Sequence, residues 1–261
     1  MDPAVVTRLR AAGCVFAEDE AAVIASAART PAELENMLRR RVEGLPLEQV
    51  VGWAEFAGLR VGVAAGVFVP RRRSEFLVAT AIALETAERP VIADVCCGTG
   101  ALGLAVAAGL SIAGRGETEL HAAEIDPDAV ACARRNVEPA GGRVYEGDLY
   151  EPLPESLKGK VTTLLCNAPY VPTGDIAFLP AEAREYEHHV ALDGGADGLD
   201  ILRRAAAGAP EWLTPGGHLL VETSEHQAGA MTAIMTETGL APRVFSDDEY
   251  GSTVVTGRLD L

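Results

Sequence analysis

From residue 90 onward, short apolar runs alternate with longer segments of helical composition. Val91 to Val95, Leu120 to Ile125 and Val161 to Cys166 have the length and residue types of buried strands, and helix-like segments lie between them. Helices that connect successive parallel strands cover both faces of the sheet that those strands form. The order of elements therefore predicts an α/β fold with a mainly parallel sheet and helices on both faces.

The two ends of the chain follow other patterns. Residues 3–43 have helical composition, with a capping box at Thr30 to Glu33, and the glycine-punctuated segment 49–69 is typical of a small hairpin. We expect a helical domain with a β-hairpin linker at 1–70 and a sheet domain at 71–261. Within the second we expect helices at 74–88, 101–110, 126–136, 198–209 and 224–238, strands at 144–145 and 218–222, a turn at 215–217, and a terminal antiparallel strand pair at 243–246 and 253–258.

Composition narrows the class of protein. Apolar residues make up 48% of the 261 residues, enough for a sizeable core, and no apolar run has the roughly 18 residues that a membrane span needs. The first ten residues lack the apolar core of a signal peptide, so we expect a cytoplasmic protein without a membrane partner. The net charge of −16 argues against direct binding of nucleic-acid phosphates. We expect Arg39 to Arg41 to lie on a solvated helix face, and the five cysteines to be reduced thiols.

A glycine-rich loop follows the first strand of the predicted sheet. Gly98 to Gly103 has the GxGxxG spacing, in which glycines let the backbone approach a ligand at the start of a helix. Glu124, at the end of the next strand, can accept hydrogen bonds from both hydroxyls of a ribose. NAD and S-adenosylmethionine both fit these features. Asp94 favours S-adenosylmethionine, because its charge suits a cationic ligand better than a pyrophosphate.

The polar tetrapeptide Asn167-Ala168-Pro169-Tyr170 follows the strand that ends at Cys166. The Asn167 amide oxygen and the Ala168 carbonyl are two acceptors, which Pro169 restrains, and Tyr170 adds an aromatic wall. Two fixed acceptors beside a flat wall suit a planar NH2 group. A hydride-transfer enzyme has no obvious use for such a slot, whereas an ordinary polar turn would have similar residues. Together with the glycine loop, the slot favours methyl transfer.

At this point the chain resembles the HemK-like protein-glutamine methyltransferases, which methylate the glutamine of the Gly-Gly-Gln loop in peptide-chain release factors. The resemblance covers about residues 46–261. The matching landmarks are Pro46, Gly52, Phe68 to Arg71, Ser74-Glu75, Asp94 to Gly100, Glu124, Gly147 to Leu149, Asn167 to Tyr170, Glu187, Ala191-Leu192, Gly194-Gly195, Asp197 to Leu199, Glu222 and Gln227.

The resemblance implies a Rossmann-like class I methyltransferase that uses S-adenosylmethionine and releases S-adenosylhomocysteine. It implies a protein substrate and a role for the N-terminal helices in recognising it. Phe68 and Arg71 would lie at the substrate mouth, although a core aromatic and a surface cation are equally good interpretations. The implied cofactor site is Asp94, Cys96, Gly98, Gly100, Glu124, Ile125, Asp148, Leu149 and Asn167, and the implied catalytic slot is Asn167, Ala168, Pro169 and Tyr170.

Three departures from the family pattern bear on the substrate. Ala168 replaces a proline, the helical segment before Pro46 is short, and Gln49 stands where the family has an aromatic residue. Methylation of a nucleic-acid adenine or of a small-molecule amide or amine is therefore an alternative, as is a non-catalytic cofactor-binding protein. We expect His188 and His189 to be loop residues rather than metal ligands.

Overall fold

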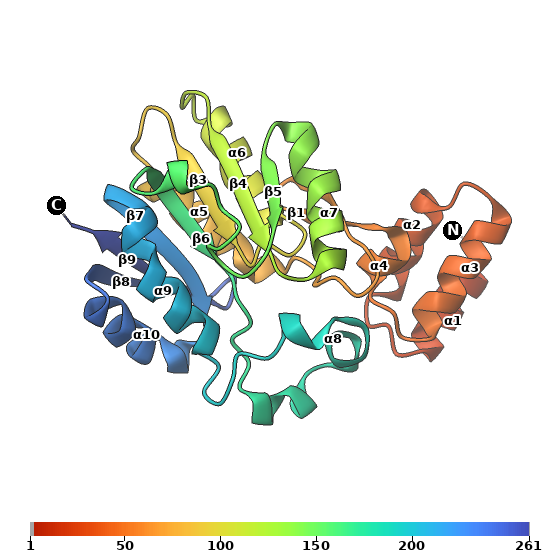
Figure 1. Ribbon diagram of the computed structural model, residues 1–261. Helices are drawn as coiled ribbons and strands as arrows, with labels where there is room; N and C mark the ends of the chain where they lie inside the picture. Colours follow the sequence, from red (N-terminus) through yellow and green to blue (C-terminus); the bar gives the residue numbers. More distant parts are fainter. Residues whose placement is uncertain (1–2, 261) are drawn as a thin grey trace.

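The computed structural model describes residues 3–260, and a seven-stranded sheet forms its centre (Figure 1). The strand order is β5-β4-β3-β6-β7-β9-β8, in which β3 to β7 pair in parallel and β9 pairs antiparallel with both β7 and β8. The predicted sheet and its antiparallel C-terminal end are confirmed. The strands are β3 (Val91–Val95), β4 (Glu119–Glu124), β5 (Arg143–Glu146), β6 (Val161–Cys166), β7 (Leu213–Thr223), β8 (Leu240–Asp247) and β9 (Ser252–Leu259).

Helices cover both faces of this sheet, and each face has its own apolar core. One core contains side chains of α5, α6 and α7, and the other contains side chains of α9 and α10. The central strand β6 is buried along almost its whole length, as expected when helices lie on both sides. These helices are α5 (Glu75–Leu84), α6 (Ala101–Ile112), α7 (Pro127–Val137), α9 (Asp200–Trp212) and α10 (Glu225–Glu237), with 3-10 turns η1 (Arg72–Ser74), η2 (Glu138–Ala140) and η3 (Glu155–Leu157).

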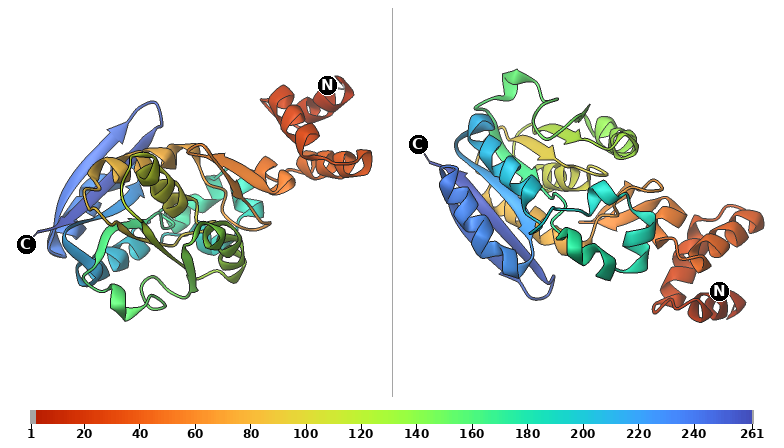
Figure 2. Two further views of the ribbon diagram at one scale, coloured as in Figure 1. Left: turned by 90° about the horizontal axis from the view of Figure 1, so that it is seen from above. Right: turned by 60° about the horizontal axis from the view of Figure 1, so that its bottom comes forward.

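The first four helices extend from one side of the sheet (Figure 2). They enclose a separate small core, whereas Phe56 and Val61 of the following hairpin belong to the core of the sheet. The proposed boundary at residue 70 stays a prediction. The bounds are α1 (Pro3–Ala11), α2 (Ala17–Ala27), α3 (Pro31–Val42), α4 (Leu47–Val51), β1 (Trp53–Phe56) and β2 (Leu59–Gly62).

The expectation for Arg39 to Arg41 is wrong at Arg41, which is buried. Its Nε and Nη1 atoms form ion pairs of 2.5 Å with Glu20 of α2 and 2.6 Å with Glu182 of α8 (Ala181–Tyr186). A charged side chain becomes buried when oppositely charged groups surround it, and here one of those groups lies 141 residues away in sequence. Helical periodicity in α3 therefore could not reveal it.

Two other elements differ from their expected form. Helix α5 ends at Leu84, because the buried carboxylate of Glu85 leaves the helix and accepts hydrogen bonds from the hydroxyls of Thr162 and Thr163 at 2.6 and 2.8 Å. The predicted turn at 215–217 lies inside β7, where the pairing with β6 shifts register. No helix in the described part of the chain is long and apolar enough to cross a membrane.

The sequence predicted no secondary structure between β6 and α9. This segment lies on the side of the sheet that faces the N-terminal helices (Figures 1 and 2). We call residues 171–199 the cover segment. Short bridges join it to residue 66 and to the start of the segment itself. It contains α8 and the 3-10 turns η4 (Thr173–Phe178) and η5 (His189–Ala191).

Candidate active site

A cavity of about 500 Å³ opens at the carboxyl ends of β3, β4 and β6. Strand order reverses between β3 and β6, and ligands of open α/β sheets bind at such a switch point. The volume lies in the usual range for small-molecule sites. Twelve residues expected at the site line this cavity: Phe68, Arg71, Cys96, Gly98, Glu124, Ile125, Asp148, Leu149, Asn167, Ala168, Pro169 and Tyr170.

Asp94 and Gly100 do not line the cavity, although both were expected at the cofactor site. Gly100 has φ +77°, and a Cβ there would lie 2.5 Å from Val137 Cγ2, so this glycine lets the loop pack on α7. Gly98 has φ +55°, and a Cβ there would meet no described atom within 4 Å, which leaves its backbone open to a ligand. Gly100 therefore allows close packing on α7, whereas Gly98 leaves its backbone accessible to a ligand.

Asp94 lies beneath the glycine loop. Its Oδ2 accepts a hydrogen bond of 2.9 Å from the Gly103 amide, while its buried Oδ1 has no partner within residues 3–260. Burial raises the pKa of this carboxyl to about 7, and the nearby charge of Glu124 acts in the same direction. A positive charge in the adjacent cavity would offset that electrostatic cost.

Glu124 ends β4 with its carboxylate against the cavity. Backbone amides of Gly98, Ile125 and Asp126 donate to it at 2.8, 2.8 and 3.0 Å. Burial raises the pKa of Glu124, although these three amides oppose the shift. The amides hold the carboxylate in one orientation, which suits recognition of a ribose diol.

Apolar and polar groups complete the cofactor side. Leu149, at φ +47°, and Ile125 line the same cavity, and Asp148 Oδ2 forms an ion pair of 2.7 Å with Arg204 Nη2. Flat apolar walls with a few polar groups at the edge are typical of an adenine pocket. The residues present thus fit an adenosine with a cationic tail.

Asn167 lies at the end of β6 with its amide nitrogen held next to α5. Nδ2 donates to Ser74 Oγ at 3.2 Å, and no described residue donates to the Asn167 amide oxygen or to the Ala168 carbonyl. Both residues line the cavity. The structure therefore brings two unsatisfied acceptors to the cavity wall, which is the arrangement that a primary amide or amine needs.

Two side chains that hold this slot, Glu222 and Arg73, were not predicted as site residues from the sequence. The Tyr170 hydroxyl donates to Glu222 Oε1 at 2.8 Å, and Arg73 Nε contacts the same oxygen at 2.9 Å. Burial raises the pKa of Tyr170, and the charge of Glu222 raises it further, so the phenol stays protonated. Glu222 was noted only as a landmark of the resemblance, and its contact with Tyr170 spans 52 residues.

The backbone of the slot rests on glycines of the cover segment. A Cβ at Gly194 would lie 2.6 Å from the Pro169 carbonyl oxygen, and one at Gly198 would lie 2.2 Å from that of Tyr170. Gln227 Nε2 donates to the carbonyls of Tyr170 and Asp197 at 2.9 and 3.0 Å. These contacts give a physical reason for the glycines and the glutamine.

Phe68 and Arg71 also line the cavity. The Arg71 guanidinium lies 4.7 Å from the centre of the Phe68 ring and forms ion pairs of 2.6 and 2.7 Å with Glu187. Glu187 is buried and also accepts from the Val69 amide at 3.1 Å. Burial raises the pKa of Glu187, against the effect of Arg71. The pair ties the cover segment to the segment before α5.

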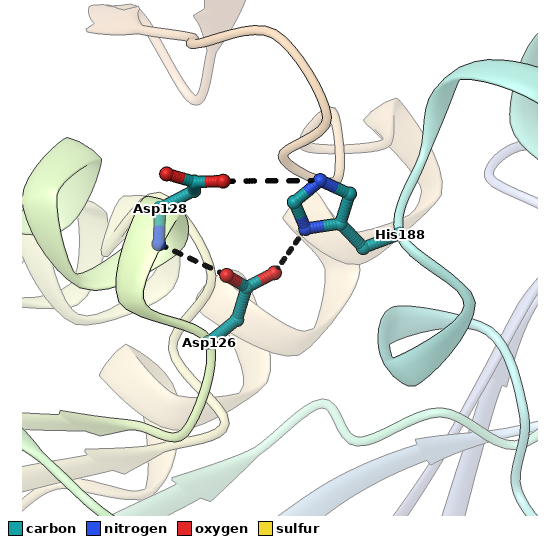
Figure 3. A group of neighbouring side chains, drawn as sticks. All are labelled: Asp126, Asp128 and His188. Carbon is teal, nitrogen blue, oxygen red and sulfur yellow. Dashed lines mark hydrogen bonds and ion pairs between the residues drawn. The ribbon is translucent and has the colours of Figure 1, made fainter.

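His188 joins the cover segment to the loop after Glu124 (Figure 3). Its Nδ1 lies 2.5 Å from Asp126 Oδ2, and its Nε2 lies 3.9 Å from Asp128 Oδ2. One ligand atom from each of the three residues lies within 4.8 Å of the others, a spacing that would also suit a metal ion, and exposed acidic groups commonly have this spacing without one. The contact between His188 and Asp126 links the cover segment to the loop after Glu124.

Comparisons with known proteins agree with this geometry. Residues 59–179 match the methyltransferase small domain family. The release factor glutamine methyltransferase of Geobacter sulfurreducens is 36% identical over 231 residues, which is 87% of this chain and 78% of that protein. A 4-amino-L-phenylalanine/4-methylamino-L-phenylalanine methyltransferase of Streptomyces pristinaespiralis is 34% identical, covering 80% of this chain and 71% of that protein.

Among solved structures, the hMettl16 catalytic domain in complex with an RNA hairpin superposes with a TM-score of 0.57 at 12% identity, covering 86% of this chain and 82% of that one. At that identity the likeness shows the methyltransferase fold alone. The relative from Geobacter sulfurreducens shows more, because both the identity and the coverage are high. This chain belongs to the release factor glutamine methyltransferase family.

Proposed function

We propose that this protein transfers a methyl group from S-adenosylmethionine to the side-chain amide nitrogen of a protein glutamine, in the Gly-Gly-Gln loop of peptide-chain release factors. S-adenosylmethionine supplies an electrophilic methyl group on a sulfonium. The observation that carries the proposal is the pair of acceptors at the cavity wall, the Asn167 amide oxygen and the Ala168 carbonyl.

Those acceptors address the chemical difficulty of the reaction. An amide nitrogen is a weak nucleophile, because its lone pair is delocalised into the carbonyl group. Asn167 and Ala168 would each accept one hydrogen bond from the NH2 group and fix the direction of the nitrogen. They would also stabilise the positive charge that develops on it. Ser74 contributes by holding the Asn167 amide with its oxygen free.

The test uses labelled S-adenosylmethionine and purified release factors, with mass spectrometry to locate the methyl group. Asn167→Ala should lower turnover by at least about 100-fold, because one preorganised acceptor is lost, while the Kd for S-adenosylhomocysteine stays within about threefold. Ser74→Ala is the matched variant, and should lower turnover less because it frees the Asn167 side chain without deleting it. Full turnover by Asn167→Ala would contradict the role of Asn167 as an acceptor for the substrate amide.

A small-molecule amine is the second candidate substrate. It is favoured by the similarity to the 4-amino-L-phenylalanine methyltransferase, which covers most of this chain. The same two acceptors would suit an aromatic NH2 group. Direct nucleic-acid binding remains unexpected, because the net charge is −16. Incubating the protein in parallel with release factors and with 4-amino-L-phenylalanine separates the two candidates by which one gains label.

The N-terminal helices are the part of the chain that we assign to recognition of the protein substrate. They extend beside the cover segment (Figure 2), and Arg41 and Tyr186 connect the two through contacts of 2.6 Å to Glu182 and 2.7 Å to the Glu43 carbonyl. A protein bound over the cavity would then meet both surfaces. We infer a cytoplasmic location from the proposed substrate.

A further inference from the structure

Glu222 lies next to the substrate slot on the neighbouring strand. Cys166 of β6 and Val221 of β7 are paired in register, so Asn167, directly after β6, lies one residue beyond this pair, as Glu222 of β7 does. Adjacent strands lie about 5 Å apart, and residues level with one another on parallel strands point to the same face. Glu222 lines the same cavity as Asn167 and is 1% exposed.

The two oxygens of this carboxylate differ. Oε1 accepts a hydrogen bond from the Tyr170 hydroxyl at 2.8 Å and forms an ion pair of 2.9 Å with Arg73 Nε. Oε2 is buried and, within the described range 3–260, has no hydrogen-bond partner. A buried acceptor without a donor is costly, and native structures keep such groups mainly where a ligand or a reaction uses them.

We propose that Glu222 is a catalytic residue whose Oε2 stabilises positive charge on the substrate nitrogen and then takes its proton. This rests on the proposed function. The nitrogen lone pair forms the new N–C bond, and the S–C bond breaks with its electrons moving to sulfur. Once the nitrogen is methylated, one of its N–H groups leaves its acceptor in the slot and passes its proton to Glu222 Oε2, which leaves a neutral N-methyl amide and a neutral carboxylic acid. The acid releases the proton to water after the product leaves.

The chemistry explains why an ordinary carboxylate suffices. An amide nitrogen with four bonds has lost its delocalisation and is a strong acid, so the acceptor needs position rather than high basicity. Arg73 and Tyr170 supply that position by holding Oε1. Asn167 and the Ala168 carbonyl cannot take the proton themselves, because neutral amides are very weak bases.

The first test needs no methyl acceptor. Sinefungin is an analogue of S-adenosylmethionine with a protonated amine where the transferable methyl group would be, so it places a cation beside the slot. Calorimetry should show that Glu222→Gln weakens sinefungin binding about tenfold and changes the Kd for S-adenosylhomocysteine less than twofold. No loss for either ligand, or an equal loss for both in a variant that still binds S-adenosylhomocysteine, overturns the proposal.

The second test follows the reaction on release factors. Glu222→Gln can still accept from the Tyr170 hydroxyl through its amide oxygen, so it should lower kcat by about 10²- to 10⁴-fold with KM within threefold. Tyr170→Phe removes the hydroxyl but leaves Oε2, and should lower kcat less than Glu222→Gln. An effect of Glu222→Gln on KM alone would contradict a catalytic role.

The two tests separate this proposal from the proposed function. Wild-type protein that does not methylate release factors would overturn the proposed substrate, while the sinefungin comparison would still decide the role of Glu222. If Glu222→Gln does not bind S-adenosylhomocysteine, the comparison moves to Glu222→Asp, which keeps the charge but withdraws it by one methylene. That variant should also lose affinity for sinefungin selectively.

Discussion

Three buried carboxylates lie in or next to the cavity, near the ends of three different strands: Asp94 in β3, Glu124 in β4 and Glu222 in β7. Arg73 forms an ion pair of 2.9 Å with Glu222, whereas no ion pair within residues 3–260 involves Asp94 or Glu124, and burial raises the pKa of both. A cationic ligand would favour the charged form of Asp94 and Glu124. The chain thus keeps electrostatic strain at this site that binding of a sulfonium would relieve.

Asp94 gives that strain a measurable pH dependence. Its pKa of about 7 in the folded state exceeds the unfolded value of 3.8, so the folded state binds more protons between those pH values and the free energy of unfolding falls as pH rises through that window. Asp94→Asn removes this dependence. The difference in unfolding free energy between variant and wild type should be more favourable to the variant at pH 8 than at pH 5, by at most roughly 2–3 kcal/mol.

Urea unfolding of the ligand-free protein at the two pH values measures this difference. Wild-type protein is its own control at pH 5, where the folded carboxyl is mainly protonated. A difference that is the same at both pH values would show that Asp94 does not titrate in this range.

At the scale of elements, the sequence predicted where strands end better than it predicted the long-range contacts that hold the residues after those ends. Val161 to Cys166 is a short, mainly apolar run, so its end, and hence the place of Asn167, could be read directly. The contacts of Gly194 and Gly198 with the slot carbonyls depend on a loop folding back over 24 or more residues. No local sequence pattern predicts that a loop folds back in this way. For the same reason, helix α8 in this loop was not predicted.

Gly198→Ala should therefore disable the slot while leaving the sheet intact. Gly198 has φ +77°, and a Cβ there would lie 2.2 Å from the Tyr170 carbonyl oxygen. Gly216 is a matched control, with φ +85° and nothing within 4 Å. Both alanines carry a similar backbone cost of about 1–2 kcal/mol. Only Gly198→Ala should also lower kcat, by about tenfold or more.

Steady-state methylation assays and thermal unfolding of both variants separate the two effects. Gly198→Ala should show both the lower unfolding temperature and the lower kcat, while Gly216→Ala should keep a kcat close to that of the wild type. If Gly216→Ala lost as much activity as Gly198→Ala, backbone strain alone would explain the result, and the packing of the cover segment on the slot would not matter.

At the scale of the whole molecule, a few polar side chains connect the N-terminal helices to the catalytic sheet through the cover segment. Gln49 is buried, and its Nε2 donates to the carbonyls of Val67 and Tyr186 at 3.2 and 3.1 Å. The departure from an aromatic residue at this position therefore has a structural use. Polar links of this length are invisible to composition and periodicity, because their partners come from three separate regions of the chain.

Arg41 is the strongest of these links, and Arg39 of the same helix provides the comparison. Arg41→Ala leaves the carboxylate of Glu20, whose side chain is 12% exposed, without its partner, and should lower the free energy of unfolding by about 3 kcal/mol. Arg39 is 59% exposed and pairs with Glu43 one turn away, so Arg39→Ala should change it by less than about 0.5 kcal/mol. Equal effects would mean that Arg41 is not buried.

The double variant Glu20→Ala with Arg41→Ala decides whether the loss comes from the unpaired charge. Removing both partners should restore part of the stability lost in Arg41→Ala, since no buried charge then remains at this pair. It should not restore the tie to Glu182, which lies in the cover segment. We therefore expect the double variant to be more stable than Arg41→Ala in urea. Both variants lack the tie to Glu182, so both should have a higher KM for release factors than the wild type. Full recovery of KM would show that the helices recognise the substrate without this tie.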